Sequence, residues 1–263
     1  MEVSLHARQQ TALDDSLTAP LVFYIGSALT MGAFIMARAN RLILPNRTHH
    51  ILHRGYNRGS LFFSEEDSET FLDFLGDALE SQQCSLHAYV LMVNHYHLVI
   101  TSGDAESIPR LMQSIGRRYT AYLNQKYDRE GMLWDGRYKS TILDSDGYVL
   151  GCQCYVEANP LRAGIVFQPD KYRWSSYSHN AKGRVDPLLS AHPTYHALGA
   201  TAIARRQAYR ELFSRGLTKL QLETLRDATQ REWVPGGDRF REEIKRALGR
   251  RIDPPILGRP RKA

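Results

Sequence analysis

The chain has 263 residues, of which 43% are hydrophobic, so wholesale disorder is excluded and one substantial core with an appendage is expected. Its formal net charge of +6 favours a polyanionic partner, nucleic acid before a membrane. The three cysteines are odd in number and lack paired-ligand spacing, which excludes a disulfide framework and indicates free thiols in a reducing compartment.

Residues 1–36 form a separate N-terminal extension of doubtful order. Its uncharged stretch is interrupted by Pro20 and Gly32, so it would make a poor membrane span. Asp14 and Asp15 stand where a signal peptide carries basic residues. We therefore expect no membrane association. We expect that the extension results from a start codon assigned too far upstream, and a weak membrane-associated segment is the alternative.

The next hundred or so residues alternate between strand and helix patterns. In chain order we predict strand 49–53, helix 65–81, strands 85–93 and 95–101, helix 109–126, strand 138–143 and helix 146–158. The helix over 65–81 has acidic residues in its first turn, and the helix over 109–126 begins at a proline. This order predicts an α+β fold, a small antiparallel sheet with helices packed on one face.

Two histidines share one face of the strand over 95–101. Alternate side chains of a strand point the same way, so His95 and His97 project together while Tyr96 points to the opposite face. Two neutral imidazoles on a rigid strand can hold one divalent cation. The spacing by itself also fits two histidines on a half-exposed strand, because the pattern is short.

A tyrosine and an asparagine close the helix over 146–158. Asn159 precedes a proline and marks the end of that helix, and Tyr155, four residues earlier, can share its face. A phenol beside a metal-bound phosphate would be a nucleophile, and the Asn159 side-chain oxygen could complete the metal's ligands. The alternative is a core tyrosine with a helix-ending Asn-Pro, since the chain has 14 tyrosines.

Five segments in this order resemble one known family. They read HILHRGYNR at 50–58, MVNHYHL at 92–98, LWDGRY at 133–138, YVEANPLRAG at 155–164 and WSSY at 174–177. Together they resemble the single-tyrosine HUH transposases of the IS200-like superfamily, in particular the branch called REP-associated tyrosine transposases. The resemblance covers about residues 37–180, which we predict to be the catalytic domain.

The resemblance implies a ferredoxin-like (RRM-like) sheet and a nuclease and strand transferase acting on single-stranded or hairpin DNA at repetitive extragenic palindromes. Tyr155 would form a 5′-phosphotyrosine link, and His95, His97 and Asn159 would hold Mg²⁺ or Mn²⁺. The sequence departs from the family at Asn159, where relatives carry glutamine or an acidic ligand, and at Tyr96, where they carry an aliphatic residue. We expect a monomer or homodimer that is cytoplasmic and associated with the nucleoid.

Cations and one amide beside the predicted strands and on the second helix are candidate DNA contacts. They are Arg54, Asn57, Arg58, Arg117, Arg118, Arg137 and Lys139. Arginine and lysine suit phosphates, and asparagine can read base edges. Any one of them could instead be an ordinary solvated surface residue.

Residues 187–263 are predicted to form a helical, basic C-terminal region, with helices over 202–213 and 217–229. Its end contains Arg259 and Arg261 on either side of a proline, which resembles the core of an AT-hook that enters narrow A·T minor grooves. The alternative is a solvated basic tail that adds salt-sensitive attraction to phosphates.

Two other functions remain open. A rolling-circle replication initiator or relaxase uses the same metal chemistry, but such proteins commonly carry paired tyrosines, whereas Tyr155 stands alone in its motif. A domesticated module that binds hairpin DNA without cleaving it would keep the fold, but the intact set of His95, His97 and Tyr155 argues against it.

Overall fold

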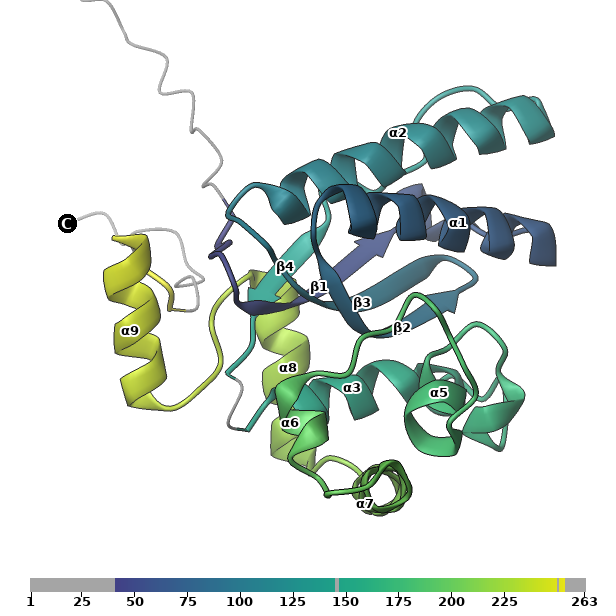
Figure 1. Cartoon of the computed structure of the whole chain (residues 1–263). Coiled ribbons are helices and arrows are strands. Elements are labelled where there is room, and N and C mark those ends of the chain that lie inside the picture. Colours follow the sequence, from purple (N-terminus) through teal and green to yellow (C-terminus); the bar gives the residue numbers. More distant parts are fainter. Residues whose placement is uncertain (1–40, 145–146, 250, 254–263) are drawn as a thin grey trace, which may run out of the picture. The chain divides into compact units, whose positions relative to one another are not determined.

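A four-stranded antiparallel sheet in the order β2-β3-β1-β4 organises the protein. The structure is a computed structural model, and it describes residues 41–144, 147–249 and 251–253. The strands are β1 (Thr48–Arg54), β2 (Ser85–Met92), β3 (His95–Thr101) and β4 (Lys139–Ile142) (Figure 1). The predicted extension over 1–36 and the predicted minor-groove residues Arg259 and Arg261 lie outside the described residues.

Two helices complete a βαββαβ unit around these strands. Helix α1 (Glu65–Ser81) connects β1 to β2, and α2 (Ser107–Tyr127) connects β3 to β4. With β1 and β3 in the centre of the sheet, this is the ferredoxin-like arrangement. The predicted α+β fold class is therefore confirmed.

Helix α1 begins where the sequence predicts because its N-terminus is capped. The Asp67 backbone N–H donates to the Ser64 side chain, and the Ser64 backbone N–H donates back to the Asp67 carboxylate at 2.9 Å. Lys126 and Tyr127 of α2 also donate to Asp67, at 2.7 and 2.8 Å. One buried carboxylate therefore both starts α1 and holds it against α2.

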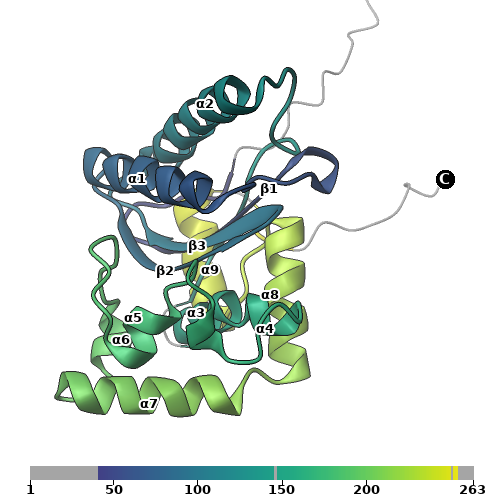
Figure 2. The same ribbon diagram turned by 90° about the vertical axis from the view of Figure 1, so that its right-hand side faces the viewer.

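Helices α1 and α2 cover one face of the sheet (Figures 1 and 2). Their fully buried side chains, including Phe71 and Tyr119, pack against Tyr96 and Leu98 of β3 in the larger hydrophobic core. Tyr96 is 0% exposed in this core, so it points away from its histidine neighbours, as predicted.

A second helical layer covers the opposite face of the sheet. It contains α3 (Val149–Glu157) and α8 (Lys219–Arg231) (Figures 1 and 2). Helix α3 contacts β2 and β3, and helix α8 contacts β1 and β4. Val90 and Val99 on the sheet pack there against Val156 and Leu225. The prediction of helices on one face was therefore incomplete: β2 and β3 are buried on both faces, and both faces must be covered.

The remaining helices surround this second layer. They are α4 (Asn159–Arg162), α5 (Tyr177–Lys182), α6 (Pro193–His196), α7 (Ala202–Arg215) and α9 (Asp238–Leu248), with 3-10 turns at Tyr56–Arg58 and Pro169–Lys171. The predicted helices over 202–213 and 217–229 correspond to α7 and α8. No helix in the described ranges combines the length and apolar composition needed to cross a membrane.

Glu157 anchors the helix that carries Tyr155. Its buried carboxylate accepts hydrogen bonds from Ser176 at 2.6 Å, Asn180 at 2.7 Å and Tyr209 at 2.8 Å. Burial raises the pKa of Glu157 to about 7, although the three donors favour its charged form. These bonds fix the C-terminal end of α3 against α5 and α7.

Candidate active site

The two histidines of β3 face the second helical layer. Their ring centroids are 5.2 Å apart, and β1 runs beside them with Leu52 opposite His97 and Arg54 opposite His95. Paired residues of an antiparallel sheet share a face, so all four side chains point the same way. This face of the sheet forms the floor of the candidate site.

A pocket of about 190 Å³ opens over these histidines. Its lining residues come from β1, β3, α4 and two helices of the second layer: Leu52, Arg54, His95, His97, Tyr155, Asn159, Arg226, Thr229 and Gln230. The Tyr155 ring is 5.8 Å from the His97 ring and nearly perpendicular to it. A phenol almost sixty residues away in sequence thus lies beside the histidine pair.

The hydrogen bonds of His95 leave its Nε2 atom available to bind a metal ion. Its Nδ1 lies 2.7 Å from the Asn94 side-chain oxygen, while the Asn94 amide nitrogen donates to the Arg58 carbonyl. The Asn94 oxygen can only accept, so His95 donates from Nδ1 and keeps a lone pair on Nε2. Burial lowers the pKa of His95 to about 4 and that of His97 well below its usual range, which favours the neutral imidazoles that bind metals.

Asn159 offers an oxygen to the same pocket. Helix α3 ends at Glu157, and Asn159 begins the short helix α4, so the predicted break lies between them. The Asn159 amide nitrogen donates to the carbonyls of Tyr155 and Val156, at 3.3 and 3.0 Å, which leaves its side-chain oxygen unused by these bonds. An amide oxygen beside two neutral imidazoles is a mixed donor set that can hold a divalent cation.

The described residues contain no cluster of three His, Cys, Asp or Glu side chains that could hold a metal ion. The three predicted ligands His95, His97 and Asn159 line one pocket, in which the amide would be the third protein ligand.

Four of the candidate DNA-binding residues lie together beside this pocket. Arg54, Arg58, Arg137 and Lys139 line an adjoining cavity of about 310 Å³, which shares Leu52, Arg54 and Gln230 with the first. Asn57 is exposed in the 3-10 turn between Arg54 and Arg58, with a left-handed φ of 50°. A basic edge thus continues from the histidine pocket toward β4.

Arg117 and Arg118 are not part of this edge. Both lie on α2, in the layer on the other face of the sheet from Tyr155. The Arg118 guanidinium is paired with Asp77 at 2.7 Å and lies 4.1 Å from the centroid of the Phe74 ring. The structure therefore separates these two candidates from the other five.

A comparison with protein families agrees with this geometry. The family model described as "Transposase IS200 like" matches residues 44–159. Over this segment the chain is similar to the IS200-like transposase family. The matched segment includes His95, His97, Tyr155 and Asn159, and it ends before the helices of the C-terminal region begin.

Two solved structures resemble this chain. A REP-associated tyrosine transposase bound to a REP hairpin is 16% identical with a TM-score of 0.49, covering 60% of this chain and 92% of that one. A putative transposase from Deinococcus radiodurans R1 is 19% identical with a TM-score of 0.32, covering 49% of this chain and 92% of that one. None of the curated proteins compared with this chain matches it.

Several residues in or beside the pocket were not predicted from the sequence. Arg226, Thr229 and Gln230 line the pocket from α8, and His50 of β1 is hydrogen-bonded to His97. His50 had a detectable signal, because it alternates with Leu52 on the strand predicted over 49–53 and with Arg54 directly after it. The α8 residues had no such signal in the sequence, because only tertiary packing brings that helix to the sheet.

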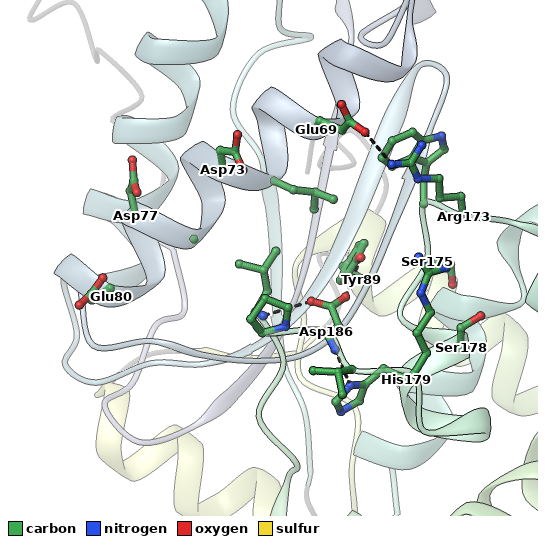
Figure 3. A pocket seen from close by; sticks show the side chains of 17 residues that line it. Glu69, Asp73, Asp77, Glu80, Tyr89, Arg173, Ser175, Ser178, His179 and Asp186 are labelled. Atoms are coloured by element: carbon green, nitrogen blue, oxygen red, sulfur yellow. Dashed lines mark hydrogen bonds and ion pairs between the residues drawn. The ribbon is translucent and has the colours of Figure 1, made fainter.

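A larger cavity, of about 570 Å³, lies between α1 and the segment that follows α4. Figure 3 shows Glu69, Asp73, Asp77 and Glu80 following one another along α1, with Arg173 opposite and paired with Glu69. A row of carboxylates repels phosphates, and none of the candidate site residues lines this cavity. It is therefore not part of the candidate site.

Proposed function

We propose that this protein is a metal-dependent nuclease and strand transferase that cleaves and rejoins single-stranded DNA through Tyr155. The observation that supports this is the shared pocket: Tyr155 is 8% exposed, and its ring lies 5.8 Å from that of His97 in a segment similar to the IS200-like transposase family. A tyrosine with a purely structural role in the core is not expected to line a polar pocket together with two histidines.

In this reaction the Tyr155 oxygen attacks a backbone phosphorus, and the bond from that phosphorus to the 3′ oxygen breaks. The phenol loses its proton, and the departing 3′ oxygen gains one, so a 5′-phosphotyrosine link and a free 3′-OH result. Because the link keeps the phosphodiester energy, another 3′-OH can displace Tyr155 and rejoin the DNA.

His95 and His97 would hold Mg²⁺ or Mn²⁺ through their Nε2 atoms, with Asn159 contributing its side-chain oxygen. When bound, such a cation polarises the scissile phosphate and offsets charge on the leaving oxygen.

The basic edge would hold the DNA beside the pocket. Arg54, Arg58, Arg137 and Lys139 are suited to backbone phosphates, and the exposed Asn57 to an unpaired base. Following the sequence resemblance, we propose that the substrate is a repetitive extragenic palindrome, a hairpin flanked by a few unpaired nucleotides. Unpaired bases are open to recognition because they are not stacked in a duplex.

A covalent-adduct assay tests this function. The full-length protein is incubated with a labelled palindromic hairpin and Mn²⁺, and a labelled protein band is sought on a denaturing gel. We expect an adduct that Tyr155→Phe abolishes and that Tyr148→Phe, at the start of the same helix, retains. Tight binding to many hairpins without an adduct would instead indicate a binding module that does not cleave DNA.

A further inference from the structure

Helix α8 brings a buried hydroxyl to the histidine pocket. Thr229 is 2% exposed, and its Oγ1 lies 2.8 Å from Nδ1 of His50 and 2.8 Å from the backbone oxygen of Leu225. His50 is itself fully buried, and its Nε2 lies 2.8 Å from Nδ1 of His97. A continuous chain of hydrogen bonds thus runs from α8 through β1 to a candidate metal ligand.

The direction of each bond in this chain follows from donor and acceptor counting. A backbone oxygen can only accept, so Leu225 takes the single hydroxyl proton of Thr229. Thr229 Oγ1 must then accept from Nδ1–H of His50. The neutral His50 ring has no second proton, so its Nε2 accepts from Nδ1–H of His97.

His97 consequently keeps its Nε2 lone pair for the pocket. In the reverse direction His97 would carry its proton on Nε2, and that nitrogen could not bind a cation. Partners that fix the tautomer and orientation of a metal-binding histidine are known to change metal affinity 10–100-fold.

We propose that Thr229 is a positioning residue of the metal site, acting through His50 to hold His97 with its Nε2 free. This inference rests on the proposed metal-dependent function. It extends the site beyond the matched segment 44–159, because Thr229 belongs to the C-terminal region. The C-terminal helices would then be needed for metal binding and not only for packing.

Thr141 provides a matched control. It lies opposite His50 in the β1–β4 pairing, and its hydroxyl donates 2.7 Å to the carbonyl of Ala228, the residue before Thr229. Both threonines therefore make a buried hydroxyl bond to an α8 carbonyl, but the Thr229 hydroxyl also bonds to the His50 ring. Replacing either with valine keeps the shape of the side chain and removes its hydroxyl.

The experiment measures Mn²⁺ binding to the full-length protein without DNA, by electron paramagnetic resonance of the free ion. We expect Thr229→Val to raise the Mn²⁺ dissociation constant by about 10-fold or more. Thr229→Ser, which keeps the hydroxyl, and Thr141→Val should both bind nearly as the wild type does. Wild-type affinity in Thr229→Val, or an equal loss in Thr141→Val, would overturn the inference while leaving the proposed function intact.

The histidine tautomers give a second readout that needs no metal and no substitution. Nitrogen-15 NMR of the wild-type protein should find the His97 proton on Nδ1 and the His50 proton on Nδ1. A His97 proton on Nε2 would overturn the inference even if Thr229→Val fails to fold. If the wild-type protein binds no Mn²⁺ at all, the proposed function fails, and the inference fails with it.

Discussion

The guanidinium group of Arg162 holds Tyr155 in two ways. Its Nη2 donates a hydrogen bond to the Tyr155 backbone carbonyl at 2.7 Å, and its central carbon lies 4.3 Å from the centroid of the Tyr155 ring. Arg162 sits at the end of α4 and Tyr155 on α3, so the contact bridges the break between the two helices. One arginine thereby fixes both the backbone and the ring of the proposed nucleophile.

Removing this contact should slow the first covalent step. We expect Arg162→Gln to lower the rate of adduct formation roughly 10-fold or more, because a nucleophile free to turn is seldom in line with the phosphorus. Arg210→Gln is the control, since Arg210 also donates to a helix carbonyl, that of Ala181, but lies away from the pocket. Equal rates for Arg162→Gln and wild type, measured on denaturing gels over time, would contradict this role.

Asn159 should contribute to metal binding but not to nucleophilic attack. Asn159→Ala removes the amide oxygen, so we expect the Mn²⁺ dissociation constant to rise by about 10-fold or more, as for other disturbances of a metal site. Tyr155→Phe, which removes no proposed ligand, should bind Mn²⁺ as the wild type does. If calorimetric titration finds the two variants equally impaired, the assignment of Asn159 as a ligand is wrong.

The DNA-binding candidates can be separated by salt dependence. Arg137 lines the basic edge, whereas Arg117 is exposed on α2 in the other helical layer. We expect Arg137→Gln to weaken hairpin binding and to reduce the slope of log affinity against log salt by about 1, the signature of one lost phosphate contact. Arg117→Gln should leave the slope unchanged in fluorescence anisotropy titrations. A larger effect for Arg117→Gln would move the DNA path to the α1–α2 face.

Buried histidines should make the protein sensitive to acid. Burial lowers the pKa of His53 to about 4, while an unfolded histidine titrates near 6.5. Below pH 6.5, His53 therefore binds a proton in the unfolded chain but stays neutral in the folded protein. The free energy of unfolding should fall by about 1.4 kcal/mol per pH unit for this group, until the folded state also protonates near pH 4.

His53→Phe isolates this effect. The His53 ring stacks on Trp134 with centroids 4.2 Å apart, and phenylalanine can keep that stacking while it cannot titrate. Urea unfolding at several pH values between 4 and 7.5 should give a shallower loss of stability for the variant, whatever its stability at neutral pH. His49, with its pKa also lowered to about 4, stays in both proteins, so part of the slope should remain. An unchanged slope would mean that His53 does not contribute.

Local patterns in the sequence correctly predicted much of the fold. Helix α1 spans Glu65–Ser81 as predicted, because its capping serine, acidic first turn and apolar spacing are all encoded within a few residues of one another. Likewise, the two-residue period of a strand was enough to put His95 and His97 on one face and Tyr96 on the other.

The layer over the second face of the sheet was harder to predict. Nothing in the spacing of α8 reveals that Leu225 packs on the sheet, because a helix's apolar stripe records that it is buried but not against which partner. The same limit explains why Arg117 and Arg137 looked equivalent as candidates although they lie in different layers.

The sequence by itself determined the order of strands and helices in the βαββαβ unit and the shared face of the two histidines, since both depend on the period of each element. Only the tertiary structure decided that Tyr155 meets those histidines and that Thr229, 179 residues from His50, is bonded to it. These long-range contacts form because separate amphipathic elements bury their apolar faces against one another. The pattern of a single segment does not show which other segment it will pack against.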